Sequence, residues 1–382
     1  MRRRVIIHGH FYQPPRDNPW TGRTKREATA FPARNWNERI HYECYKPNSE
    51  AELNIDGHEQ LINNYEYISF NIGSTLSAWM IKAHVGTYRK ILEADKKTSN
   101  AIALPFNHTI LPLDSDLNLK AQISWGIREF QVRFNRKPVA MWLPECAVSM
   151  RVADELVKNG MKYMILTSGQ ALEVKRLGGT RWTDVSNGNI DVRRPYRLYT
   201  LSGHIEVFFS DHGLAADLAF NRLLDNPYAL ADRIERLFGG SDEDLLVTIA
   251  TDGETFGHHH KGAEKGLAHL LKYELPARGI GVTNFEKYLS DTKVNWEVRI
   301  KEYSSWSCMH GVERWRSACG CGAEHGSNLD WREPLRESIA WLGDRMIELV
   351  YKRAEKYFVN GIEEGIKAYG TVLANVTQLE KF

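Results

Sequence analysis

Seven short apolar segments constrain the fold of this chain more than any other feature of its sequence. Most are unbroken rather than alternating runs, which is typical of strands in a parallel sheet covered on both faces. Helical patterns fall between them, and this alternation predicts an α/β fold. The segments are Arg4–His8, Tyr67–Asn71, Ala101–Pro105, Val139–Leu143, Tyr163–Thr167, Ile205–Phe209 and Leu245–Ala250.

Capping residues place two of the intervening helices. Ser149 is expected to cap a helix over Arg151–Asn159, and Asn226-Pro227 to open a helix that stops at Gly239. The segment Tyr196–Leu201 is expected to pair with the following apolar segment as a hairpin through Ser202-Gly203, which departs from a strictly parallel pattern.

The hydrophobic pattern of the sequence changes beyond about residue 289. Trp331–Phe358 repeats apolar residues at spacings of three and four, which predicts one helical face, and Gly361–Phe382 also has a helical pattern. We therefore expect a barrel-like α/β domain over residues 1–289 and a helical C-terminal region over 290–382. The apolar face consists of Leu335, Ile339, Leu342, Met346, Leu349 and Val350.

Charge and composition exclude several classes of partner. The chain has 50 basic and 48 acidic residues, a net charge of +2, which favours neither nucleic acid nor an anionic membrane. No apolar run reaches the roughly 20 residues needed to span a bilayer, and the N-terminal apolar segment is too short for a signal peptide. Five cysteines agree with a reducing compartment, so a cytoplasmic location is expected. The sequence does not predict an oligomeric state.

Polar residues follow the predicted strands where those strands end. The carboxyl ends of parallel strands meet at one face, and active sites are built there. The chain also has 11 tryptophans and 16 tyrosines, which can stack on sugar rings but also fill ordinary cores. The strand-end residues are His8 and His10, Asn71, Trp142 to Glu145, Asp211 and His212, and Asp252 and Glu254.

Glu145 and Asp252 stand out among these residues. Each is a carboxylate at the end of an apolar strand, and Trp142 precedes Glu145 by three positions. Two carboxylates on either side of one bond are what glycoside hydrolysis needs, since one attacks or stabilises the sugar carbon and the other protonates the leaving oxygen. The ordinary alternative is that each is a solvated loop carboxylate.

Three motifs together resemble glycoside hydrolase family 57, a family of retaining α-glycosidases and glucanotransferases. They are HGHFYQP (8–14), MWLPE (141–145) and TDGETFGH (251–258). The resemblance covers roughly residues 5–331 and implies an incomplete (β/α)7 barrel followed by helices. The first motif departs from the family pattern, because Phe11 and Tyr12 separate His10 from Gln13, and the family's second motif has no clear match.

The resemblance also implies roles for single residues. Glu145 would be the nucleophile and Asp252 the general acid/base of a double displacement on an α-1,4-glucan, without a cofactor or a metal. Water as acceptor would make the enzyme a hydrolase, and a sugar hydroxyl would make it a transferase. Glu254 is expected to be a supporting acid. The expected substrate-binding residues are His8, His10, Trp142, Asp211, His258, Trp306, His310 and Trp315.

Two other functions remain open. The first is a metal-dependent deacetylase or amidohydrolase, in which histidines and an acid at strand ends bind zinc. It leaves the Trp-Leu-Pro-Glu motif without a role. The second is a non-catalytic glycan-binding protein, which would need neither carboxylate. The residues available for a metal site of the first kind are His8, His10, Asp211, His212, His258 and His260.

A cysteine-rich segment near the C-terminal region has two interpretations. Cys308, Cys319, Cys321 and His325 could bind a structural zinc ion, although their spacing lacks the usual C-x2-C pair. The favoured interpretation is a glycine-rich loop packed over the barrel mouth. Cys146, next to Glu145, is expected to be a packed thiol.

Overall fold

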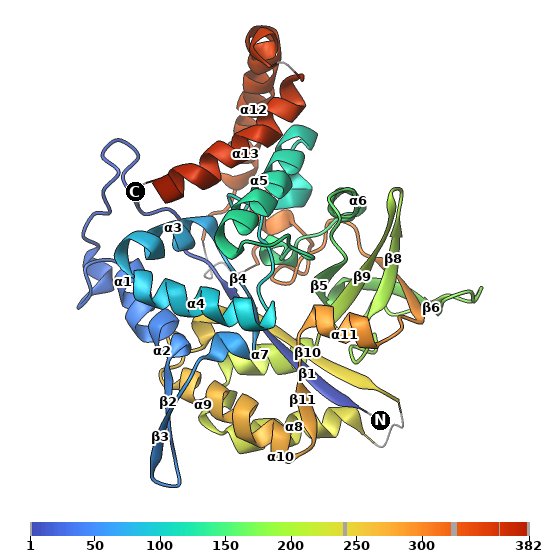
Figure 1. The fold of residues 1–382 in the computed structure, drawn as a ribbon. Coiled ribbons are helices and arrows are strands. Elements are labelled where there is room, and N and C mark those ends of the chain that lie inside the picture. The colour runs from blue at the N-terminus through green and yellow to red at the C-terminus, as the bar shows by residue number, and fades with distance from the viewer. Residues whose placement is uncertain (1, 240–242, 322–326, 359, 380–382) are drawn as a thin grey trace. The chain divides into compact units, whose positions relative to one another are not determined.

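The computed structural model describes residues 2–239, 243–321, 327–358 and 360–379 (Figure 1). It has an α/β fold and divides into two compact units. Unit 1 consists of Met1–Ile102, Asp191–Pro195 and Phe208–Val294, and unit 2 of Ala103–Ile190, Tyr196–Val207 and Asn295–Phe382. The two units are groups of residues that lie close together in space, and they say nothing about function. The expected domains over 1–289 and 290–382 therefore stay a prediction.

Unit 1 is built on a parallel sheet around β1 (Arg3–Phe11). This strand pairs with β10 (Leu245–Asp252) along its length, with β11 (Ile280–Val282) near its start and with β4 (Ser69–Ile72) near its end. The middle of β1 is fully buried. The unbroken apolar run therefore forms a parallel strand, as expected.

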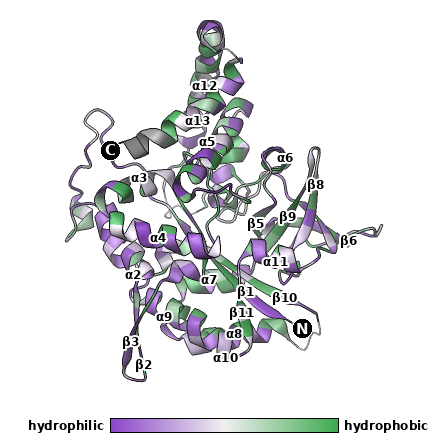
Figure 2. Ribbon diagram, viewed as in Figure 1, coloured by the Kyte–Doolittle hydropathy of each residue, from purple (hydrophilic) through white to green (hydrophobic). Residues whose placement is uncertain are grey.

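The remaining elements of unit 1 surround this sheet. The hairpin is β2 (Ala51–Ile55) and β3 (His58–Ile62). The helices are α1 (Trp36–Ile40), α2 (Lys46–Ser49), α3 (Ser74–Ala83), α4 (Val85–Thr98), α7 (His212–Phe220), α8 (Pro227–Phe238), α9 (Ala263–His269), α10 (Leu275–Ala277) and α11 (Phe285–Asp291). Figure 2 shows hydrophobic and hydrophilic residues mixed along these helices, as expected for helices that bury one face.

Unit 2 contains a mixed sheet in the order β5-β9-β8-β12-β6-β7, in which β9 runs on into unit 1. The hairpin of β8 and β9 is antiparallel, with Thr200 opposite Gly203, and confirms the predicted pairing. The strands are β5 (Tyr163–Thr167), β6 (Ala171–Arg176), β7 (Thr183–Asp184), β8 (Tyr196–Thr200), β9 (Gly203–Ser210) and β12 (Trp296–Ile300).

Two of the seven expected strands are present only as isolated parallel bridges. Residue 101 pairs with Phe70 in unit 1, while Ala103 pairs with Met141 and Ala140 with Tyr163 in unit 2. A proline follows each of these segments, at Pro105 and Pro144. Because proline has no N–H to donate to a ladder, pairing ends there after one or two hydrogen bonds.

The long helices of unit 2 are α5 (Asp116–Phe134), α6 (Met150–Lys158), α12 (Arg332–Ala354) and α13 (Ile362–Leu379). Helix α13 packs on α5, where Trp125 Nε1 donates to Ile366 O at 2.6 Å. The predicted caps are confirmed, since the side chains of Ser149 and Asn226 accept hydrogen bonds from the first turns of α6 and α8. Among the described residues, none of the helices is both long and apolar enough to cross a membrane.

Short helical turns connect these elements. They are η1 (Ala28–Ala30), η2 (His41–Tyr45), η3 (Asn64–Glu66), η4 (Leu111–Leu113), η5 (Pro144–Cys146), η6 (Ser168–Gln170), η7 (Leu223–Asp225), η8 (Gly253–Thr255), η9 (Leu270–Glu274), η10 (Glu313–Trp315) and η11 (Glu355–Tyr357). Two of them, η5 and η8, carry the predicted catalytic motifs or follow them directly.

Candidate functional site

Glu145 lies in unit 2 on a turn with an unusual backbone. Its φ is 58° and that of Cys146 is 49°, so two consecutive non-glycine residues are left-handed. Such residues cost on the order of 1–3 kcal/mol each and persist only where their surroundings hold them. Here the Gln170 side chain donates to Cys146 O at 2.7 Å. The turn therefore presents Glu145 in a conformation that the sequence would not adopt alone.

Two donors hold the carboxylate of Glu145. Trp306 Nε1 lies 3.0 Å and Ser307 Oγ 2.5 Å from Glu145 Oε2, and the Trp306 backbone N–H donates to Glu145 O at 3.0 Å. The ring of Trp306 meets that of the fully buried Trp142 edge to face, with centroids 5.2 Å apart. The carboxylate of Glu145 is therefore oriented and half-buried beside two indoles, and its role as a nucleophile stays a prediction.

Unit 1 brings together polar residues from the ends of three parallel strands. In the register of the sheet, His10 of β1 is opposite Asn71 of β4 on one side and Asp252 of β10 on the other. A nitrogen of the Asn71 side chain lies 2.9 Å from His10 Nδ1. These strands therefore place an imidazole, an amide and a carboxylate at one edge of the sheet.

His8 precedes His10 by two residues on β1, lies in the core and does not reach solvent. Its Nδ1 lies 3.0 Å from Ser69 Oγ and its Nε2 3.1 Å from Asn71 Oδ1. Burial lowers the pKa of His8 from 6.5 to about 3, so the ring is neutral at physiological pH. With both ring nitrogens engaged, His8 orients Asn71.

The two acids of the Asp252 motif have opposite environments. Asp252 is the exposed last residue of β10, whereas Glu254 is buried on η8. Tyr45 donates its hydroxyl to Glu254 Oε1 at 2.6 Å, and the Tyr12 backbone N–H donates to the same oxygen at 3.3 Å. Burial raises the pKa of Glu254 to about 8. Asp252 is therefore an accessible acid, and Glu254 is a buried acid that is protonated at neutral pH.

Other predicted residues lie elsewhere on unit 1. Asp211 caps α7, where its Oδ1 accepts from Leu214 N at 2.8 Å. His258 contacts Glu43 through Nδ1, and His260 Nε2 donates to Ala219 O at 2.7 Å. These contacts give each side chain a structural partner, and substrate binding by Asp211 and His258 stays a prediction.

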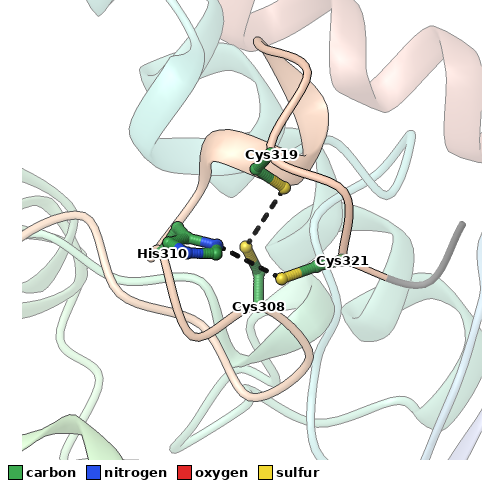
Figure 3. Close-up of side chains that lie close together, drawn as sticks. All are labelled: Cys308, His310, Cys319 and Cys321. Carbon is green, nitrogen blue, oxygen red and sulfur yellow. Dashed lines mark hydrogen bonds between the residues drawn. The ribbon is translucent and has the colours of Figure 1, made fainter. Parts of the chain in front are cut away.

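The alternative metal site at the strand ends finds no support in this geometry. Over the described residues, one group of histidine, cysteine and acidic side chains has ligand atoms close enough to hold a metal ion. It consists of Cys308, His310, Cys319 and Cys321 of unit 2 (Figure 3), not the strand-end histidines. His325, the histidine of the alternative zinc interpretation, lies outside the described residues.

Two further predicted residues lie near the same loop. His310 belongs to this cluster, with Nδ1 3.3 Å from Cys321 Sγ. Trp315 lies on η10 and lines a shallow pocket with Trp331 and Leu335. Substrate binding by either side chain stays a prediction.

Sequence reasoning missed two residues that contact the predicted acids. Ser307 follows the predicted Trp306, and its position in the Trp-Ser-Cys run is the only local signal for it. Tyr45 lies 209 positions from Glu254 and no pattern in the sequence connects the two. Asn71 was recognised as a strand-end residue but was given no role.

The sequence pattern described as "Glycosyl hydrolase family 57" matches residues 6–300. This match covers most of the chain, which therefore belongs to glycosyl hydrolase family 57. A comparison with curated proteins found no match.

Several solved structures have a fold similar to that of this chain. An exo-type maltose-forming amylase from Pyrococcus sp. ST04 superposes with a TM-score of 0.73 at 15% identity, covering 99% of this chain and 68% of that one. A branching enzyme from Pyrococcus horikoshii superposes with a TM-score of 0.65 at 14% identity. The match covers 100% of this chain and 87% of that one. A 4-α-glucanotransferase from Thermococcus litoralis superposes with a TM-score of 0.56 at 16% identity. The match covers 80% of this chain and 43% of that enzyme, which is less than half of its length. At these identities the similarity concerns the fold.

Proposed function

We propose that this protein is a retaining enzyme that cleaves or transfers α-1,4-glucans by double displacement. The observation that carries the proposal is the carboxylate of Glu145, held by Trp306 and Ser307 on a strained turn beside Trp142. Membership of the family supports it. The similar solved structures are named as an amylase, a glucanotransferase and a branching enzyme, which favours an α-glucan substrate.

In the proposed mechanism Glu145 attacks the anomeric carbon. As the new C–O bond forms, the glycosidic bond breaks, its electron pair stays on the leaving oxygen, and Asp252 gives that oxygen a proton. In the second step the Asp252 carboxylate takes a proton from water or a sugar hydroxyl. The oxygen so activated attacks the anomeric carbon and releases Glu145. The two inversions retain the configuration.

We propose that Trp306 and His10 contact sugar around this bond. The ring of Trp306 offers an apolar face to a pyranose, and His10 offers a ring nitrogen from the strand-end edge. Trp142 is fully buried and packs against Trp306, so it would hold that ring in place. His8 supports this edge through Asn71. Glu254, neutral because its pKa is about 8, avoids a second negative charge beside Asp252.

We also propose that the seven predicted strand segments close into an incomplete (β/α)7 barrel as the catalytic domain, with helices and a capping loop supplied by residues 290–382. Parallel pairing within each unit supports this scaffold: β10, β1, β4 and residue 101 in one, and residue 103, residues 140–141 and β5 in the other. A cytoplasmic location is part of the proposal, and the five cysteines, which form no disulfide, are consistent with it.

The test uses maltoheptaose and three forms of the protein. The wild type should yield shorter glucans if it hydrolyses, and both longer and shorter glucans if it transfers. Glu145→Ala should lose about three orders of magnitude or more in turnover, while Glu59→Gln, which changes an exposed glutamate on β3, should retain full activity. Azide should rescue Glu145→Ala and give a glycosyl azide of inverted configuration.

Two outcomes would overturn this proposal. Full activity of Glu145→Gln would remove the nucleophile assignment. Release of acetate from acetylated sugars, with no change in maltoheptaose, would replace the glycosidase with a deacetylase.

A further inference from the structure

The loop that contacts Glu145 carries a cluster of soft metal ligands. Three thiols and one imidazole, from Cys308, Cys319, Cys321 and His310, have ligand atoms that all lie within 4.8 Å of one another. Figure 3 shows the four side chains converging from two stretches of the same loop. Only Cys308 is buried, and the other three close the cluster from the solvent side.

The distances fit a tetrahedral zinc centre. With Zn–S about 2.3 Å and Zn–N about 2.0–2.1 Å, tetrahedral angles put two sulfurs about 3.8 Å apart and a sulfur and a nitrogen about 3.6 Å apart. The sulfurs of Cys308 and Cys319 lie 3.8 Å apart, and His310 Nδ1 lies 3.3 Å from Cys321 Sγ. A disulfide needs a sulfur separation of about 2.0 Å. The four side chains therefore form a nearly preorganised set.

The chemistry of the ligands selects the metal. Three thiolates and an imidazole favour zinc over hard cations such as magnesium or calcium, which prefer oxygen.

We propose that Cys308, His310, Cys319 and Cys321 bind a structural zinc ion. All four tetrahedral positions are supplied by the protein, which is the arrangement of a structural rather than a catalytic zinc. The site differs from the strand-end site and needs no part of the proposed sugar chemistry.

This centre would fix a loop that has little regular structure of its own. Between Trp306 and Cys321 the only helical element is the three-residue η10, and Val312 is fully buried. Trp306 and Ser307, the two donors to Glu145, directly precede Cys308. A zinc ion would therefore anchor the partners of that carboxylate, a consequence that rests on the proposed function.

The test measures metal content rather than activity. The untagged protein, purified without chelator after growth with zinc, should contain about one zinc per chain by mass spectrometry of the metal. Cys319→Ser and Cys321→Ser should each retain less than about a tenth of it. His260→Gln should keep its zinc, because His260 belongs to the strand-end set and contacts Ala219 instead.

A spectroscopic measurement covers the case in which the cysteine variants do not fold. Wild-type protein stripped of metal and reloaded with Co²⁺ should show thiolate-to-cobalt charge transfer and the visible bands of a tetrahedral site. Wild-type protein without metal, or with a Cys308–Cys319 disulfide found by mass spectrometry, would overturn the proposal. So would unchanged zinc in folded Cys319→Ser. Each of these results is independent of whether maltoheptaose is cleaved.

Discussion

At the scale of single residues, the proposed nucleophile Glu145 is held in an unfavourable backbone conformation. The left-handed backbone of Glu145 and Cys146 is unfavourable, and the hydrogen bonds from Gln170, Trp306 and Ser307 stabilise it. The carboxylate is therefore already oriented in the absence of substrate, which under the proposed mechanism would lower the cost of reaching the transition state. The Trp-Leu-Pro-Glu motif predicted this residue but not its donors.

Removing either donor should slow catalysis without abolishing substrate binding. Ser307→Ala and Trp306→Phe each delete one hydrogen bond to Glu145 Oε2, and Phe keeps an aromatic ring beside Trp142. We expect kcat on maltoheptaose to fall about 10- to 100-fold in each, with KM changed less than about threefold in Ser307→Ala.

The control for these variants is Ser317→Ala in the same loop, since Ser317 bonds to Glu313 rather than to Glu145. Its kcat should equal that of the wild type. Equal kcat values for Ser307→Ala and Ser317→Ala would show that the donor to Glu145 has no role in catalysis.

At the scale of elements, periodicity identifies a helix but not the surface that it packs on. The predicted apolar face of α12 forms as a helix, yet Leu335 is 48% and Ile339 54% exposed. By contrast, a glycine in α5 lets this helix approach the backbone of Leu104 and Pro105 closely. A Cβ at Gly126 would lie 2.1 Å from Leu104 O, so this close approach excludes any side chain.

Gly126→Ala should therefore destabilise unit 2. The added methyl would push α5 away from Leu104 and Pro105, and we expect a loss of about 1–3 kcal/mol in the free energy of unfolding. The matched control is Gly343→Ala on α12, where a Cβ meets nothing within 4 Å. That variant should gain about 0.5–1 kcal/mol. Thermal unfolding followed by circular dichroism compares the two, and a higher melting temperature for Gly126→Ala would contradict the packing.

At the scale of the whole molecule, buried titratable groups make stability depend on pH. Burial raises the pKa of Glu254 from 4.5 to about 8 and lowers that of His8 from 6.5 to about 3. Below pH 6.5 the unfolded chain binds a proton on His8 that the folded protein does not bind, which opposes the effect of Glu254. Between about pH 6.5 and 8 the folded protein holds the extra proton on Glu254, so its contribution to stability falls as pH rises.

Glu254→Gln should remove this dependence. Its free energy of unfolding should decline less steeply than that of the wild type between about pH 6.5 and 8, by about 1.4 kcal/mol per pH unit. Urea denaturation at several pH values measures the two slopes, and Glu59→Gln, an exposed glutamate, should keep the wild-type slope. Parallel curves for Glu254→Gln and the wild type would mean that Glu254 is ionised in the folded protein.

Local patterns in the sequence determined much of this protein. The strand segments Tyr67–Asn71 and Leu245–Ala250, which become β4 and β10, follow from apolar runs. The caps at Ser149 and Asn226 and the β8–β9 hairpin follow from capping and turn residues a few positions apart. The motifs around Glu145 and Asp252 are also visible in the sequence, because each is a contiguous run, and together they resemble the family.

Only the tertiary structure decided which side chains meet. It placed Ser307 on Glu145 and Tyr45 on Glu254, and it put His310 with the three cysteines, where the sequence suggested His325. It also reduced two expected strands to isolated bridges. These outcomes depend on the path of the chain between distant segments. Periodicity and capping act over a few residues and carry no information about that path, whereas close packing selects one set of long-range contacts.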